Sequence, residues 1–171
     1  MQVTEPLPIA LANAEDLASW VTPYLATEPV VAEKALVELR RLRDALRAAL
    51  VAHTAHLVTT RGLAALNALV DAHLAVHHTL VAARGRVGSA RISTGPNGPS
   101  LLLSDVCLAI VELFGSAKAA RIKQCANDAC TRFFLDASKS GTRTWCDMKT
   151  CGNRAKAARF YERRVSSASS D

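Results

Sequence analysis

Cys125-Ala-Asn-Asp-Ala-Cys130 and Cys146-Asp-Met-Lys-Thr-Cys151 are two short segments with a cysteine at each end. Fifteen residues separate them, and together they hold four of the five cysteines in the 171-residue chain. Two thiol pairs at about this separation are typical of a structural zinc site, because Zn²⁺ takes four ligands in a tetrahedron and each pair supplies two. The pattern predicts one structural zinc ion bound by Cys125, Cys130, Cys146 and Cys151.

Disulfides, core thiols and iron fit these cysteines less well than zinc does. Disulfides fit poorly with an odd number of cysteines and with a cytoplasmic location, which we expect because Met1–Pro6 does not begin a signal peptide. Four unrelated buried thiols would need a more apolar segment than 125–151. Rubredoxin-like iron sites have more closely spaced pairs. A catalytic zinc ion usually has a His or carboxylate ligand, and no histidine follows His78.

The positive charge of the chain is concentrated around the cysteines. Residues 1–117 hold nine Lys and Arg against ten Asp and Glu, whereas residues 118–165 hold twelve against four. A nearly neutral body therefore carries a basic module, which favours a polyanionic partner over a surface kept basic only for solubility. Zinc with four thiolates carries a charge of −2, so some of the basic residues balance the metal centre.

Hydrophobic periodicity predicts a mostly helical (α+β) protein. Apolar residues recur every three or four positions, which predicts helices over 13–26, from Pro29 to an interruption at Thr60-Arg61-Gly62, and over 63–77. Residues 101–114 are apolar nearly all round and are predicted to form a central buried helix. Segments 79–83 and 88–94 are predicted to form a short β-hairpin, and a turn follows at 95–99. No stretch approaches the ~20 apolar residues that a membrane helix needs.

Residues 118–165 are predicted to form a small treble-clef-like zinc module with four cysteine ligands. Thr131–Leu135 and Ser138–Trp145 would form its β-hairpin, and a C-terminal helix would cover 154–164. The N–H groups at the start of that helix would face the thiolates. The expected domains are thus a helical one over 1–117, the zinc module over 118–165 and a disordered tail over 166–171.

The tetrapeptide Cys151-Gly152-Asn153-Arg154, with Trp145-Cys146 before it and Ala155-Lys156-Ala157-Ala158-Arg159 after it, resembles the CGNR zinc finger over about residues 121–164. The preceding part is similar to the ABATE-type domain, notably over 16–20 and 38–43. Bacterial proteins with both parts are described as stress-induced transcription regulators, so the resemblance implies a DNA-binding regulator. Relatives usually begin with an apolar strand and an Asn-Thr pair, so we expect this N-terminal domain to be trimmed.

The basic side chains of the module are the predicted nucleic-acid contacts. Lys156, Arg159 and Arg163 are three and four residues apart and form one stripe on the last helix. Phe160 and Tyr161 are expected to pack on Phe133, Phe134 and Trp145 from other faces of that helix. Arg154 fits a structural role beside the thiolates as well as DNA contact. The complete predicted contact set is Arg132, Lys139, Arg143, Arg154, Lys156, Arg159 and Arg163.

A transcription regulator is the first functional hypothesis, with the N-terminal domain sensing an effector or forming a homodimer, because one short module buries too little surface for tight specific binding. An RNA-binding or ribosome-associated module is the second hypothesis. It would use Phe133, Phe134 and Trp145 to stack on bases if they are exposed. A protein-interaction adaptor, in which zinc is purely structural, is the third.

No arrangement of residues indicates an enzyme. No motif places a nucleophile beside a base, and no glycine-rich phosphate loop follows a strand. The histidine pairs His53/His56 and His73/His77 have helical spacing, but such histidines are more often polar residues at the edge of an apolar face than metal ligands. Cys107 lies in an apolar run and is predicted to be a small buried hydrophobic residue.

Overall fold

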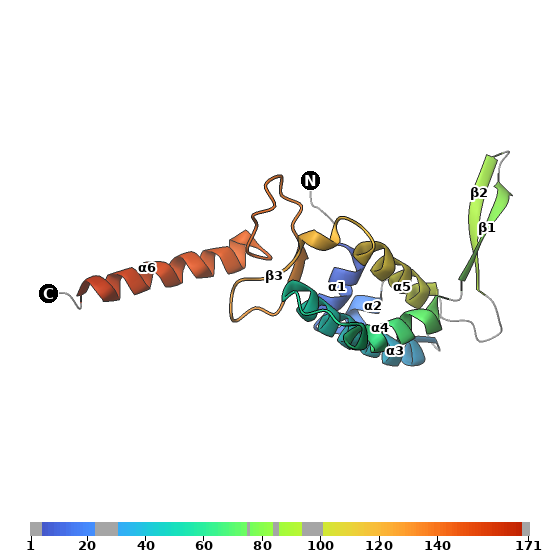
Figure 1. Ribbon diagram of the computed structural model, residues 1–171, viewed down its shortest axis with the longest axis horizontal. Coiled ribbons are helices and arrows are strands. Elements are labelled where there is room, and N and C mark those ends of the chain that lie inside the picture. The colour runs from blue at the N-terminus through green and yellow to red at the C-terminus, as the bar shows by residue number, and fades with distance from the viewer. Residues whose placement is uncertain (1–4, 23–30, 75, 84–85, 94–100, 169–171) are drawn as a thin grey trace.

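The computed structural model describes residues 5–22, 31–74, 76–83, 86–93 and 101–168 (Figure 1). Most of these residues are helical, and the strands form two small hairpins. In chain order the elements are α1 (Leu7–Asn13), α2 (Leu17–Val21), α3 (Val31–Thr54), α4 (Thr60–His73), β1 (Val76–Ala83), β2 (Arg86–Ser93), α5 (Leu101–Phe114), the 3-10 turn η2 (Ala119–Arg121), β3 (Ile122–Gln124), β4 (Phe133–Leu135), the π-helical turn η3 (Met148–Gly152) and α6 (Asn153–Ala168). The predicted fold class is confirmed.

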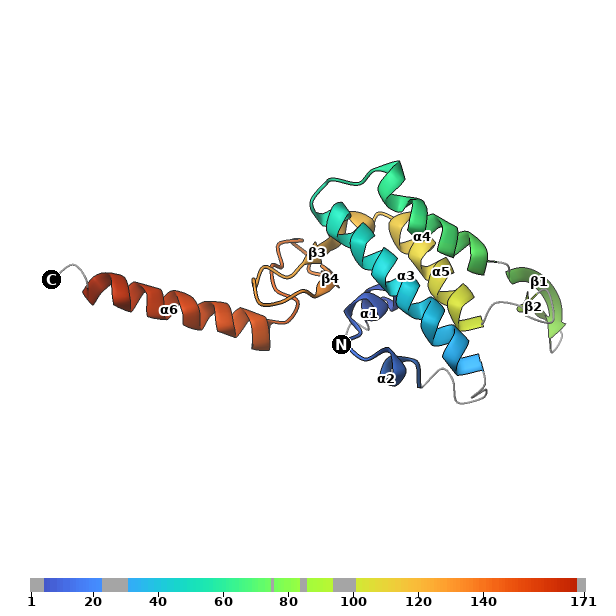
Figure 2. The ribbon, with the colours of Figure 1, turned by 90° about the horizontal axis from the view of Figure 1, so that it is seen from below.

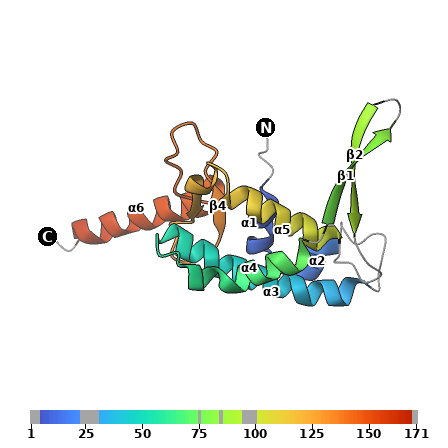
Figure 3. The ribbon, with the colours of Figure 1, turned by 45° about the vertical axis from the view of Figure 1, so that its right-hand side comes forward.

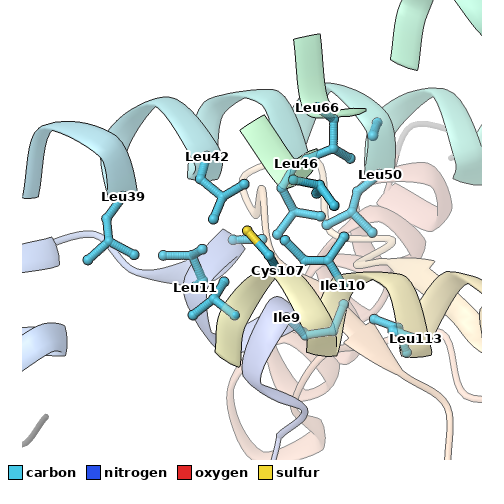
Figure 4. Packing of buried hydrophobic residues seen from close by; sticks show 14 of the residues in the cluster. Ile9, Leu11, Leu39, Leu42, Leu46, Leu50, Leu66, Cys107, Ile110 and Leu113 are labelled. Atoms are coloured by element: carbon cyan, nitrogen blue, oxygen red, sulfur yellow. The ribbon is translucent and has the colours of Figure 1, made fainter. Parts of the chain in front are cut away.

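The body of the protein is a layer of three helices, α3, α4 and α5, with α1 and α2 against it (Figure 2). Leu39, Leu42, Leu46 and Leu50 recur at spacings of three and four on α3, and all four are fully buried. They meet Ile110 and its neighbours on α5 in one apolar cluster (Figure 4). Burying each such leucine contributes about 1.5–3 kcal/mol, so this stripe explains why α3 lies where it does.

Several helix boundaries differ from the predictions: α4 ends at His73 instead of residue 77, α6 continues to Ala168 into the predicted disordered tail, and two further differences have a clear local cause. The first predicted helix, 13–26, is replaced by α1 and α2, because Asp16 rather than Asn13 caps the second of them by accepting the Ala18 N–H at 2.9 Å. Its last residues, 23–26, lie outside the described residues. Thr60-Arg61-Gly62 does not interrupt a helix but begins α4, since the Thr59 hydroxyl accepts the Gly62 N–H at 3.0 Å. Polar residues that resemble breaks are here the caps of new helices.

The β1–β2 hairpin and α6 extend from opposite ends of the body (Figures 1 and 3). β1 and β2 pair antiparallel from Val76↔Ser93 to Ala83↔Arg86, which confirms the predicted hairpin and lengthens it. His77 therefore lies in a strand and does not share a helix face with His73. The predicted turn at 95–99 lies outside the described residues. None of the described helices combines the length and apolar composition needed to cross a membrane.

Cys107 lies in the apolar cluster and is fully buried, as predicted. Burial raises the pKa of its thiol to about 12, so the thiol stays protonated and unreactive at neutral pH. We expect iodoacetamide at about pH 8 to leave Cys107 unmodified in the native protein and to alkylate it after denaturation. Mass spectrometry of tryptic peptides measures both states, and rapid native alkylation of Cys107 would contradict the packing described.

The zinc module and the helical body share this core. Ile122 of β3 and Phe133 of β4 belong to the same buried cluster as the leucines of α3. The guanidinium of Arg47 on α3 lies 5.6 Å from the centre of the Phe133 ring and donates to the Thr131 carbonyl at 3.3 Å. The hairpin of the module is therefore fixed against the helices by apolar burial and by a cation–π contact.

Asn13 connects the end of α1 to the module. Its side-chain Nδ2 donates to the Phe133 carbonyl at 2.7 Å, and its Oδ1 accepts the Phe133 N–H at 2.9 Å. The side-chain amide of Asn13 thus forms two hydrogen bonds with the backbone N–H and carbonyl of Phe133, as a neighbouring strand would. Asn13 was predicted to start a helix, but it is the last residue of α1, and its contact with a residue 120 positions away could not be read from local sequence.

Replacing Asn13 by Ala should lower the free energy of unfolding by about 1–3 kcal/mol, because the buried Phe133 peptide then loses both partners. Urea unfolding of the zinc-loaded protein measures this change. Asn67→Ala is the matched control: Asn67 is exposed on α4, and its loss should change stability by less than about 0.5 kcal/mol. Equal effects of the two variants would contradict the docking role of Asn13.

Candidate metal centre

The side chains of Cys125, Cys130, Cys146 and Cys151 converge on one point between β3 and the start of α6. Their sulfur atoms all lie within 4.8 Å of one another. The Cys146 Sγ is 3.7 Å from both the Cys130 Sγ and the Cys151 Sγ. A tetrahedron of thiolates about 2.3 Å from zinc has edges of about 3.8 Å, so these separations fit a single zinc ion.

Backbone hydrogen bonds shape the first cysteine pair into a tight turn. The Cys130 N–H donates to the Asn127 carbonyl at 2.7 Å, and the Asn127 Oδ1 accepts the Ala129 N–H at 3.1 Å. The Cys125 N–H donates to the Arg132 carbonyl at 2.9 Å, which continues the pairing of the hairpin. The turn therefore directs both sulfurs to the same side.

A capped π-helical turn follows Cys146 and contains Cys151, the last of the four cysteines. Asp147 begins it by accepting the Thr150 N–H at 2.7 Å and the Thr150 hydroxyl at 3.0 Å. These hydrogen bonds lower the pKa of the Asp147 carboxyl, which keeps it charged at the positive end of the turn. Cys151 lies in the last part of the turn and is buried, so its sulfur is positioned directly before α6.

The residues after Cys151 have identifiable local roles. A Cβ atom on Gly152 would lie 2.5 Å from the Met148 Sδ and 3.3 Å from the Trp145 Cδ1, so a glycine lets both side chains approach the turn. The Asn153 Nδ2 donates to the Lys149 carbonyl at 2.9 Å and thereby satisfies an acceptor of the π-helical turn. Gly152 and Asn153 thus form the junction between the cysteines and α6.

The strand pairing of the module differs from the prediction. β4 (133–135) pairs with β3 from Ile122↔Leu135 to Gln124↔Phe133, and not with 138–145. The predicted pairing of Thr131–Leu135 with Ser138–Trp145 is therefore wrong. The apolar side chains of Ile122 and Phe133 decide the pairing, because both must face the helical core. The polar residues 138–145 form a loop instead.

A buried ion pair holds that loop. The carboxylate of Asp136 is fully buried. It accepts hydrogen bonds from the Lys123 ammonium at 2.8 Å, from the backbone N–H of Arg143 at 2.9 Å and from the Ser138 hydroxyl at 2.6 Å. The Lys123 ammonium also donates to the carbonyls of Gly141 and Arg143. Hydrogen bonding from Lys123, followed by that from Ser138, strongly lowers the pKa of Asp136. Sequence reasoning missed this pair, since its two members are thirteen residues apart in no known motif.

Two of the predicted basic contacts, Arg143 and Arg132, interact with side chains or carbonyl groups outside their own helix or turn. The Arg143 guanidinium lies 4.8 Å from the centre of the Phe134 ring and donates to the Trp145 carbonyl at 2.8 Å and to the Cys146 carbonyl. Arg132 approaches the Glu5 carboxylate at 3.9 Å. Arg154 lines an open cavity of about 970 Å³ together with Cys130, Cys146 and Cys151. It therefore lies where it can balance the negative thiolates.

The remaining predicted contacts lie on exposed surface. Lys139 is in the loop, and Lys156, Arg159 and Arg163 lie on the part of α6 that extends away from the body (Figure 1). Phe160 and Tyr161 are 51% and 67% exposed, so the prediction that they pack on the module is wrong. Phe133 and Phe134 are buried instead by the helical body and by Arg143, and are not available for stacking on bases. The part of α6 that carries Phe160 and Tyr161 extends beyond the body in which Phe133 and Phe134 are buried (Figure 1).

The fold and the cysteine cluster define a zinc-finger protein whose metal centre lies between a helical body and a C-terminal basic helix. Residues 121–164 match the CGNR zinc finger, and residues 6–117 match ABATE, whose description is "Putative stress-induced transcription regulator". The second match covers more than half of the chain, so the chain belongs to the ABATE family. The cysteine cluster of its CGNR zinc finger suits one zinc ion. A comparison with curated proteins found no match.

Proposed function

We propose that this protein is a zinc-dependent DNA-binding transcription regulator of the bacterial cytoplasm, without catalytic activity of its own. The observation that carries the proposal is the position of α6. Its basic stripe of Lys156, Arg159 and Arg163 is exposed on a helix that begins at the metal centre and extends beyond the body (Figure 1). A helix presented in this way can enter the major groove, with basic side chains on the phosphates that flank it.

In this proposal zinc has a structural role. Cys125, Cys130, Cys146 and Cys151 hold the ion and leave no ligand position for a substrate. Because Cys151 closely precedes Asn153, the first residue of α6, the ion determines where the helix starts and in which direction it extends. Arg154 balances the charge of the thiolates and remains near enough to the helix start to reach a phosphate.

The proposed DNA contacts fall into two groups. Lys156, Arg159, Arg163 and Lys139 contact DNA directly, because all four residues are exposed to solvent. Arg132 and Arg143 first stabilise the module through Glu5 and Phe134, and contact DNA only with the outer part of their guanidinium groups. The helical body would bind an effector or a second protomer, since a single helix reads only a short half-site.

A selection from sheared genomic DNA tests the proposal. Purified, zinc-loaded protein is mixed with the fragments at near-physiological salt, and the retained fragments are sequenced. A recurrent short motif that is lost on chelation of zinc is the expected result. Retention without a motif would favour a general polyanion binder and make RNA the next candidate. No retention would contradict the proposal and favour a protein-interaction adaptor.

A further inference from the structure

Phe160 is a large apolar side chain on the basic side of α6. Phe160 follows Lys156 by four residues and precedes Arg163 by three, so the 3.6-residue helical repeat places all three on the same side of the helix. Its side chain is 51% exposed, and its ring meets the Tyr161 ring edge-on at a centroid distance of 5.9 Å. Phe160 therefore presents apolar surface within the stripe assigned to DNA.

The surroundings of Phe160 limit what can cover it. An apolar protein surface that buried the ring would also have to bury the charges of Lys156, Arg159 and Arg163, which is costly unless they are paired. A DNA major groove avoids this cost, because its phosphates pair with the cations while its floor offers an apolar group. That group is the C5-methyl of thymine, which phenylalanine side chains contact in direct readout.

We propose that Phe160 is a specificity-determining residue that recognises thymine through its 5-methyl group. The inference rests on the proposed DNA-binding function and adds to it a base preference and the residue that produces it. The basic stripe would provide affinity that is independent of sequence, and Phe160 would favour sites with a thymine at the position it reaches. One buried methyl group corresponds to about four-fold in affinity.

Tyr161 provides a matched control on the same helix. It follows Phe160 by one residue, so it lies about 100° further around the helix axis. Its neighbours one turn earlier are Ala157 and Ala158, and none of the stripe residues Lys156, Arg159 and Arg163 lies three or four positions from it. At 67% exposure it presents as much aromatic surface as Phe160 does, but not within the basic stripe.

The test compares two versions of the most strongly retained duplex from the genomic selection, synthesised with thymine or with uracil throughout. Uracil lacks only the methyl group. The full-length, zinc-loaded protein should bind the thymine duplex about four-fold more tightly. Phe160→Ala should bind both duplexes equally and keep the salt dependence of the wild type, whereas Tyr161→Ala should keep the preference for thymine.

Three outcomes would overturn the inference. Salt-dependent binding with equal affinity for both duplexes would remove the role of Phe160 and leave the proposed function intact. If the preference for thymine persists in Phe160→Ala, it must come from another residue or from the flexibility of the duplex. Absence of binding to either duplex would overturn the proposed function and this inference with it.

Discussion

Duplex DNA should bind about 100-fold more weakly at about 0.15 M salt when Lys156, Arg159 and Arg163 are all replaced by glutamine. Each lost phosphate contact lowers the slope of log affinity against log salt by about 0.9, so the triple variant should lose about three units of slope. Glutamine keeps the helix propensity of α6, so the helix itself is retained. Fluorescence anisotropy at several salt concentrations measures both quantities.

The control for this experiment is a variant with the same loss of charge elsewhere. Arg40 and Arg61 are exposed on the helical body, Lys118 is exposed in the turn between α5 and η2, and their replacement by glutamine also removes three positive charges. If only net charge matters, the two triple variants will behave alike. A small effect of the control beside a large effect of the α6 variant would assign DNA contact to the stripe, and the reverse would refute it.

Removal of zinc should unfold the module around β3, β4 and η3. Zinc contributes about 10–16 kcal/mol to the folding of small finger peptides at neutral pH, which is comparable to the ~5–15 kcal/mol stability of a whole domain. Hydrogen exchange should show loss of protection in 122–153 after chelation or in Cys146→Ser. Ile122 and Phe133 are part of the shared core, so the urea midpoint of the helical body should also fall.

Acid should act in the same direction as chelation. Burial raises the pKa of the Cys130 and Cys146 thiols above its ordinary value, so zinc must displace protons to bind them. Zinc affinity should therefore increase as pH rises and decrease as pH falls.

Cys107→Ala is the control for the cysteine variants, because it should retain one zinc ion per chain. Unchanged protection in metal-free protein would contradict a structural role for zinc.

Much of the candidate site could be predicted because it depends on spacing along the chain. The four cysteines lie in two short segments whose length suits a metal ion, and they converge as expected. The stripe on α3 was also predictable, since helical periodicity repeats over many residues and gives a strong signal. The hairpin β1–β2 and the helix α5 follow from similar local patterns.

Apart from the helix boundaries, what sequence reasoning missed concerns contacts between distant residues. Asn13 and Asp136 look like ordinary polar residues, yet one anchors the module to α1 and the other closes its loop. The pairing of β4 with β3 depended on which apolar side chains the helical core would accept. The exposure of Phe160 depended on the direction of α6, which helical periodicity does not contain.

By itself the sequence determined the metal, the four residues that suit it, the concentration of basic charge around them and the three long helices of the body. These depend on residue type and on spacing over a few turns. Only the tertiary structure decided which side chains of the basic module are held inside the protein and which are presented to a partner. That division depends on burial against Asn13, Arg47 and the helical core, and no local pattern encodes such burial.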